Sequence, residues 1–181
     1  VLDFQWDVVQ RQDLNLSLVE PSSARLAHEL AQLPGVMSLE PARNAAVRVH
    51  FQGRSRQIGL RSLLPGGQHS RAIDVTGQEI PPPPHGVILS AKLADVLGAK
   101  IGDTIMLEAL EGRQRITPLP IVALAEDFTG IAAYMDLHAI NHFLGEGDVI
   151  TGASIGLDFS QRANFLAALK EIPRVSSVAI K

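Results

Sequence analysis

The sequence predicts an α+β protein whose two ends together build one sheet with helices and whose middle forms an inserted, mostly β subdomain. Two observations carry this prediction: the ends share a strand–helix–strand pattern, and the middle is dense in turn residues. Of the 181 residues, 46% are apolar and 19% are charged, which is ordinary for a folded domain. A chain of this length buries enough surface to fold without disulfides or a structural metal.

An internal repeat relates residues 16–39 to residues 155–178. In each copy an alternating apolar stretch leads into a helix and then into a second strand. Two βαβ units that face each other form a split ferredoxin-like sheet, so we expect the first strand to begin, and the last to end, at one edge. Apolar helix residues recur at i, i+4 and i+7, on one face. They are Leu26, Leu30 and Leu33, then Phe165, Leu169 and Ile172.

Each helix of the repeat has a polar start and a proline end. Ser22 and Ser160 stand where a hydroxyl would accept a hydrogen bond from the first turn, so we expect them to be the N-caps. Pro34 and Pro173 follow the two helices, and a proline cannot continue a helix.

Turn residues set the limits of the middle subdomain. Pro65-Gly66-Gly67 opens it, so we expect an inserted, mostly β subdomain with short helices at 65–149. The remaining residues, 1–64 and 150–181, would form a discontinuous α/β domain. Because glycines stand at both crossings, we expect a hinge around Pro65–Gly67 and Ile150–Gly152.

Short elements are predicted within and just before the insertion. A hairpin over 46–60 turns at Gln52-Gly53-Arg54, and Pro81–Pro84 is typical of a stiff polyproline II spacer. The remaining predicted elements are a helix at 90–97 capped by Ser90 and ended by Gly98, a strand at 104–110, β-favouring stretches at 115–117 and 119–125, and a helix at 137–144 capped by Asp136 and ended by Gly145.

Charge and residue types argue against several classes of function. The formal net charge is −3, from 16 basic and 19 acidic residues, whereas nucleic-acid binding needs a basic face. The absence of cysteine removes thiolate catalysis, cysteine zinc sites and disulfides. No apolar run approaches the ~20 residues of a transmembrane helix. The first residues carry acids and have no signal-peptide pattern, and the missing Met suggests a piece of a longer protein.

One string matches a catalytic motif. Gly152-Ala153-Ser154-Ile155-Gly156 fits the nucleophile elbow G-x-S-x-G, which requires a sharp strand-to-helix turn at the serine. The repeat instead places Ser154 at the start of a strand, and no histidine follows Gly145. We therefore expect a strand here and no hydrolase.

Two histidines have a spacing that suits a metal. His138 and His142 stand at i and i+4 on a predicted helix, so their rings could share one ion. The zincin pattern would need Glu at 139, which is Ala, and no third ligand stands out among Asp136, Glu146 and Asp148. Surface or half-buried histidines are the competing interpretation.

The remaining polar motifs predict no site. Gly66-Gly67 and Gly145-Glu146-Gly147-Asp148 lack the pattern of a phosphate-binding loop, and Glu126-Asp127 is explained by a solvated strand end. Phe4 and Trp6 would either pack on the sheet or lie at membrane headgroups. We expect no catalytic, cofactor-binding or metal-ligating residue, and hence no cofactor.

The chain resembles a known family, the extracytoplasmic domain of FtsX-like, MacB-like ABC transporter permeases. The order and spacing of several strings carry the resemblance from end to end. They are Arg11-Gln12-Asp13, Val19-Glu20-Pro21, Leu33-Pro34-Gly35-Val36, Glu40-Pro41-Ala42-Arg43, Gly86-Val87-Ile88-Leu89-Ser90, Leu93-Ala94, Leu97-Gly98, Ile101-Gly102-Asp103, Ala132-Ala133-Tyr134-Met135 and Leu169-Lys170-Glu171-Ile172-Pro173-Arg174-Val175. The resemblance implies a porter-like part built from both chain ends, with an inserted subdomain.

The resemblance also implies a function without catalysis. Such a domain lies in the periplasm and belongs to an inner-membrane permease through flanking transmembrane helices. It binds substrate or partner proteins, and it relays the cycle of a cytoplasmic ABC ATPase during export of lipoproteins, peptides or drugs. No nucleic acid is expected as a partner. The alternative function is a free-standing ferredoxin-like sensor of small molecules, because split βαβ units commonly hold regulatory ligands.

Overall fold

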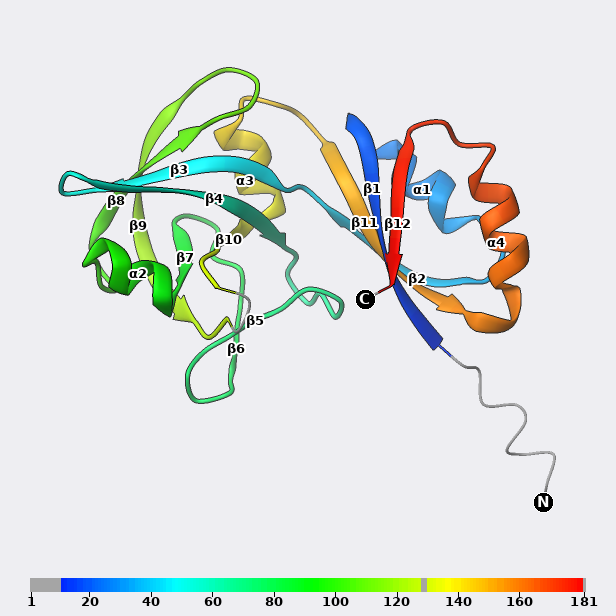
Figure 1. Cartoon of the computed structure of the whole chain (residues 1–181), viewed down its shortest axis with the longest axis horizontal. Coiled ribbons are helices and arrows are strands. Elements are labelled where there is room, and N and C mark those ends of the chain that lie inside the picture. Colours follow the sequence, from blue (N-terminus) through cyan, green and yellow to red (C-terminus); the bar gives the residue numbers. More distant parts are fainter. Residues whose placement is uncertain (1–10, 128–129, 181) are drawn as a thin grey trace. The chain divides into compact units, whose positions relative to one another are not determined.

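The computed structural model describes residues 11–127 and 130–180 (Figure 1). Phe4 and Trp6 lie outside these residues. The structure is a mixed α+β protein, mostly sheet, and it divides into two compact units. Unit 1 comprises Val1–Pro41 and Val149–Lys181, and unit 2 comprises Ala42–Asp148. In the part of the chain that is described, no helix has both the length and the apolar character needed to cross a membrane.

Unit 1 is a four-stranded sheet with helices. Its strand order is β12-β1-β11-β2, and β1 pairs antiparallel with both β11 and β12. The strands are β1 (Arg11–Ser23), β2 (Val36–Ala42), β11 (Val149–Asp158) and β12 (Val175–Ile180). The helices are α1 (Arg25–Ala31) and α4 (Arg162–Leu169), the latter preceded by a 3-10 turn at Phe159–Gln161.

The two ends of the described chain lie side by side in unit 1. Leu14, near the start of β1, is opposite Ile180 at the end of β12, and Leu18 is opposite Val175 (Figure 1). The prediction that the first strand begins where the last strand ends is therefore confirmed.

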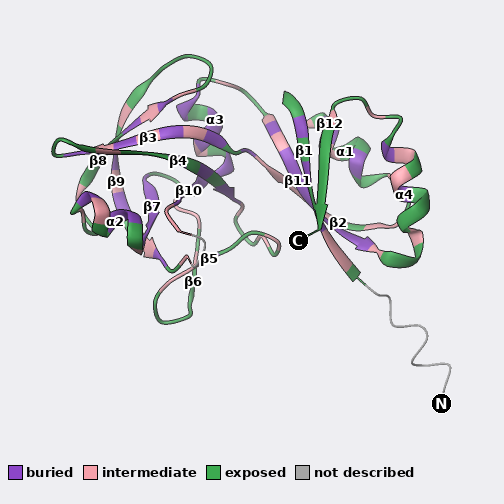
Figure 2. Cartoon of the chain, in the orientation of Figure 1, coloured by how far each residue is buried: buried purple, intermediate pink, exposed green. Residues whose placement is uncertain are grey.

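The helical stripes of the repeat form the core of unit 1. Leu26 and Leu30 of α1 and Phe165 and Leu169 of α4 are buried. They pack with apolar residues of β1 and β11, and Leu33 and Ile172 are partly buried against the same cluster. Figure 2 shows β11 largely buried and the edge strand β12 exposed.

The predicted serine caps of the repeat are wrong. Ser22 lies inside β1, because β1 resumes its pairing with β11 after a register shift and brings Ser22 opposite Ile150. Helix α1 begins only at Arg25, and its N-cap residue Ala24 has no side-chain cap. Ser160 lies in the 3-10 turn, where its N–H is bonded by the Asp158 carboxylate at 3.0 Å. Asp158, two residues earlier, caps this 3-10 turn, and the N-cap residue of α4 is Gln161, which has no side-chain cap.

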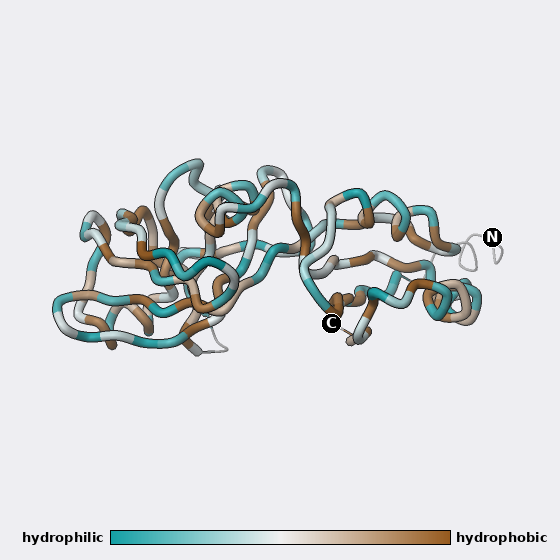
Figure 3. Tube along the Cα trace, turned by 90° about the horizontal axis from the view of Figure 1, so that it is seen from above, coloured by the Kyte–Doolittle hydropathy of each residue, from teal (hydrophilic) through white to brown (hydrophobic). Residues whose placement is uncertain are grey.

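Unit 2 is a closed barrel. Its strand order is β10-β4-β3-β8-β9-β7, and a small sheet of β5 (Ala72–Ile73) and β6 (Glu79–Ile80) lies outside it. The barrel strands are β3 (Ala45–Phe51), β4 (Arg54–Leu63), β7 (Val87–Ser90), β8 (Thr104–Ala109), β9 (Ile116–Ala125) and β10 (Ala133–Asp136). The helices are α2 (Ala91–Leu97) and α3 (Leu137–Phe143). Hydrophilic and hydrophobic stretches alternate along the chain (Figure 3), and in β3 the buried Val47 and Val49 alternate with the half-buried Arg48 and His50.

The barrel takes up residues that the sequence analysis assigned to the other domain. Strand β3 pairs with β8, and β4 pairs with β10, so the hairpin over 45–63 belongs to unit 2. The chain therefore first crosses between the units at 41–42 rather than near 64, whereas the second crossing, at 148–149, lies one residue from the expected boundary. Pro65–Gly67 lies inside unit 2, away from both crossings, whereas Ile150–Gly152 lies in β11 directly after the second crossing.

Local turn chemistry follows the prediction closely in unit 2. The Ser90 hydroxyl caps α2, and Gly98 ends that helix in the left-handed conformation with φ 72°. The Asp136 carboxylate caps α3. The β3–β4 hairpin turns at Gln52 and Gly53, which have φ values of 47° and 80°, as a two-residue turn with two left-handed residues requires.

Candidate functional site

The G-x-S-x-G string forms part of a strand, as predicted. Ser154 lies in the middle of β11 and is 5% exposed, far from the strand-to-helix turn that a nucleophile elbow needs. The first glycine of the string is required by packing, because a Cβ at Gly152 would collide with the Leu16 carbonyl oxygen of β1. The motif is thus explained by close strand packing.

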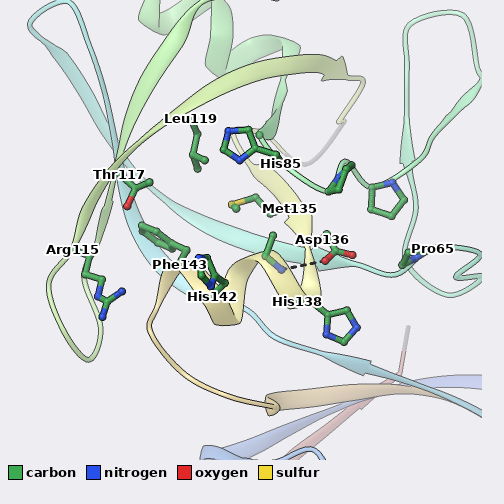
Figure 4. A pocket seen from close by; sticks show the side chains of 14 residues that line it. Pro65, His85, Arg115, Thr117, Leu119, Met135, Asp136, His138, His142 and Phe143 are labelled. Atoms are coloured by element: carbon green, nitrogen blue, oxygen red, sulfur yellow. Dashed lines mark hydrogen bonds between the residues drawn. The ribbon is translucent and has the colours of Figure 1, made fainter.

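The two predicted metal candidates are exposed on α3. His138 and His142 both face a pocket of unit 2 (Figure 4). Among the described residues, no group of three or more His, Cys, Asp or Glu side chains is arranged to hold a metal ion. Of the acids considered as a third ligand, Asp136 caps α3 and Glu146 pairs with Arg43.

The pocket has a volume of about 730 Å³ and lies wholly in unit 2, within the range of small-molecule sites. It is enclosed by α3, by strands β9 and β10, by the proline-rich stretch before β7 and by Pro65 after β4. In Figure 4 Met135 lies at its centre, with Leu119 and His85 above it and Phe143 and His142 on the α3 side. The other lining residues are Pro65, Pro82, Pro84, Gly86, Arg115, Thr117, Asp136, His138 and Ala139.

The floor and rim of the pocket differ in chemistry. Leu119, Met135 and Phe143 are 5%, 2% and 6% exposed and belong to the barrel core. Arg115 and the three histidines are exposed at the rim. Asp136 is the one carboxylate among the described lining residues, and its Oδ2 accepts the Ala139 N–H at 3.1 Å (Figure 4). The pocket therefore joins an apolar floor to a rim rich in hydrogen-bond donors.

A buried arginine joins the two chain segments that enter and leave unit 2. The Arg43 side chain is 1% exposed, and its Nη2 lies 3.1 Å from Glu146 Oε2. Its Nη1 donates to the Asn44 carbonyl at 2.8 Å, and its backbone N–H donates to the Ser62 hydroxyl at 2.9 Å. Arg43 follows the first crossing and Glu146 precedes the second. This ion pair ties both crossings to the barrel.

A second polar cluster contradicts the expectation of a solvated Glu126-Asp127 pair. The Asp127 side chain is only 6% exposed, and it lies 3.8 Å from Arg61 Nη1. The Tyr134 hydroxyl donates a hydrogen bond to Asp127 Oδ2. Burial, and then the hydrogen bond and negative charge of Asp127, raise the pKa of Tyr134 to about 12. Glu126 is exposed as expected.

The comparisons with known proteins are informative at the level of structure. No protein-family model matches the sequence, and no curated protein matches it significantly. The extracellular domain of the noncanonic ABC-type transporter YknZ from Gram-positive bacteria superposes with a TM-score of 0.59 at 12% identity, covering 95% of this chain and 100% of that one. The periplasmic region of MacB from Actinobacillus actinomycetemcomitans gives 0.59 at 9% identity, covering 94% and 88%.

The chain has the fold of the MacB-like periplasmic domain. The likeness extends over both units and over nearly the full length of each solved domain, so it includes the barrel as well as the sheet. The resemblance predicted from the ordered sequence strings is thus confirmed for the fold.

Sequence reasoning missed the pocket, the Arg43–Glu146 pair and the Tyr134–Asp127 pair. The pocket and the Arg43–Glu146 pair depend on residues from distant segments that the closed barrel brings together. Tyr134 and Asp127 stand only seven residues apart, but their contact follows no motif of the sequence. The sequence holds a weak signal for Arg43. This arginine stands two residues before the strand β3, whose alternating Ala45, Val47 and Val49 predict a buried face. Nothing in the sequence pointed to its partner.

Proposed function

We propose that this chain is the extracytoplasmic domain of a MacB-like ABC transporter permease in the inner membrane. The observation that carries the proposal is the shared fold over 95% of this chain and the whole YknZ domain. In the proposed role the domain is periplasmic, performs no catalysis, binds substrate or partner proteins, and relays the cycle of a cytoplasmic ATPase.

The position of the chain ends supports this role. A domain inserted between two membrane helices must begin and end at the same place, and Leu14 of β1 is paired with Ile180 of β12. The strand order β12-β1-β11-β2 with antiparallel pairing around β1 also supports a split ferredoxin-like, porter-like sheet in unit 1. In such an arrangement unit 1 would be the part joined to the membrane.

To relay the conformational cycle of the ATPase, unit 2 must move as one rigid body. The Arg43–Glu146 pair holds the entering and leaving segments together at 3.1 Å, and the barrel has its own core. We therefore place the proposed hinge at the two crossings, 41–42 and 148–149. A displacement of either crossing would then turn the whole barrel.

Paired spin labels in the parent transporter test the proposal. The chain has no cysteine, so introduced cysteines are its unique labelling sites. One pair, Lys170→Cys and Arg113→Cys, joins exposed positions of units 1 and 2; the control pair, Lys92→Cys and Arg113→Cys, lies within unit 2. We expect ATP to change the distance distribution of the first pair and leave the control unchanged. Identical distributions for the first pair with and without ATP would refute the relay.

A further inference from the structure

The pocket of unit 2 has the features of a ligand site that the transport role does not assign. Its volume of about 730 Å³ is bounded below by the core residues Leu119, Met135 and Phe143. Prolines 65, 82 and 84 line it as well. Proline has no N–H and a fixed φ. The proline side of the pocket is therefore apolar, and its backbone loses little conformational entropy when a ligand binds.

The rim of the pocket carries an arginine that the protein itself does not use as an ion-pair donor. In the described chain, no hydrogen bond or ion pair engages the Arg115 guanidinium. Its position is nevertheless defined by Gly145, where a Cβ would lie 2.7 Å from Arg115 Nη2. Gly145 also has φ 70°, which favours glycine. A glycine at the end of α3 therefore makes room for the guanidinium beside the pocket.

The remaining polar groups favour an anionic ligand group. His85, His138 and His142 add imidazole nitrogens along the lining, and an imidazole N–H donates to anionic oxygens. The single carboxylate of the described lining, Asp136, is 9% exposed and is bonded to the Ala139 N–H. Arginine binds carboxylate and phosphate oxygens with a planar fork of donors. Apolar floor and cationic rim together complement an amphipathic anion.

We propose that the unit 2 pocket binds a small amphipathic anion, whose apolar body lies on Leu119, Met135 and Phe143 and whose carboxylate or phosphate is bound by Arg115. This inference does not depend on the transport role, because the pocket is formed by unit 2 alone.

Titration calorimetry of the full chain with three decyl probes tests the inference. Decanoate and decyl phosphate carry an anionic head, and decan-1-ol carries none. We expect saturable 1:1 binding of at least one anionic probe and binding of decanol that is about tenfold weaker or more, since a charge-assisted hydrogen bond is worth ~1.5 kcal/mol. The stronger anionic probe distinguishes a fatty-acid ligand from a phosphate-headed one. Equal binding of decanol and both anions, or no saturable binding, would overturn the proposal.

Variants locate the binding event. Arg115→Gln should weaken anion binding about tenfold and leave decanol unchanged, whereas Arg113→Gln, in the same loop but outside the pocket lining, should change neither. Ala139→Trp and Thr117→Tyr each fill the cavity from a different element, α3 and β9, and should abolish binding. Circular dichroism identifies the folded variants. Undiminished anion binding by a folded cavity-filling variant, or by Arg115→Gln, would contradict the assignment.

Discussion

Arg43 is a charged side chain in the interior of unit 2, where water hydrates its guanidinium hardly at all. At 1% exposure it depends on Glu146 and the Asn44 carbonyl, because a buried charge without partners is strongly unfavourable. Glu146 is 31% exposed, so the acid loses less solvation than the arginine. The stability of the junction therefore depends on the acid being present.

Removing that acid tests the junction. Glu146→Ala leaves the buried guanidinium without its counter-charge, and we expect the free energy of unfolding to fall by about 2 kcal/mol. The exposed acid Glu126 provides the control, since Glu126→Ala should change stability by less than ~0.5 kcal/mol. Urea denaturation measures both. Equal stabilities of the two variants would show that Arg43 does not need Glu146.

Tyr134 is the single tyrosine of the chain, so its titration can be followed alone by tyrosinate absorbance. Burial and Asp127 raise its pKa from 10.0 to about 12. Since the folded-state pKa lies above the unfolded value, this contribution to stability is complete below pH 10 and is lost as the pH rises through about 12. We expect a native midpoint near 12, and a lower midpoint in Asp127→Asn, which removes the negative charge. A native midpoint at 10 would contradict the described environment.

At the scale of elements, the caps divide into those that sequence predicts and those that it does not. Ser90 and Asp136 cap their helices as predicted, because each is the last residue of a short buried strand and the helix begins at the next residue. Ser22 and Ser160 do not, because strand pairing of β1 extends through Ser22 and Asp158 takes the N–H of Ser160. At Ser22 the pairing with a distant strand decides the backbone, whereas at Ser160 a neighbouring acid competes for the same N–H.

Ser90 contributes more than an ordinary cap. Its buried hydroxyl oxygen accepts the N–H of Leu93 at 3.3 Å and that of Ala132 at 3.0 Å, so it joins α2 to the start of β10. Ser90→Ala leaves two buried donors without an acceptor, and we expect a loss of about 2 kcal/mol. Ser160→Ala, at the cap position that is not used, should cost less than ~0.5 kcal/mol. Thermal melting of both variants measures the difference, and similar melting temperatures would exclude the double role.

Gly152 has a steric role in β11. Because a Cβ there would collide with the Leu16 carbonyl oxygen, Gly152→Ala must displace β1 or β11, and we expect unit 1 to lose about 1–3 kcal/mol. Gly59 is a matched control, because it also lies in a strand but has nothing within 4 Å of an added Cβ. Gly59→Ala should be nearly neutral. Hydrogen exchange in β1 reports the change, and unchanged protection of β1 in Gly152→Ala would rule out the collision.

At the scale of the whole molecule, the sequence predicts the sheet and the insertion but not the residue at which the insertion begins. The repeat is visible because Leu26, Leu30, Phe165 and Leu169 recur with helical spacing and form one buried cluster. The hairpin over 45–63 looks continuous with that repeat along the chain. It belongs to the barrel because β3 pairs with β8, and sequence alone does not contain that pairing. The pocket was missed for the same reason, since its lining comes from separated segments.

The central claim is that this chain is a domain held by a transporter in a membrane. The most direct test is to sequence the parent gene on both sides of this segment and measure the hydropathy of the flanking residues. We predict one run of ~20 apolar residues shortly before Val1 and another soon after Lys181, each long enough for a transmembrane helix. Polar flanks on both sides, or a stop codon directly after Lys181, would contradict the claim and favour the free-standing sensor instead.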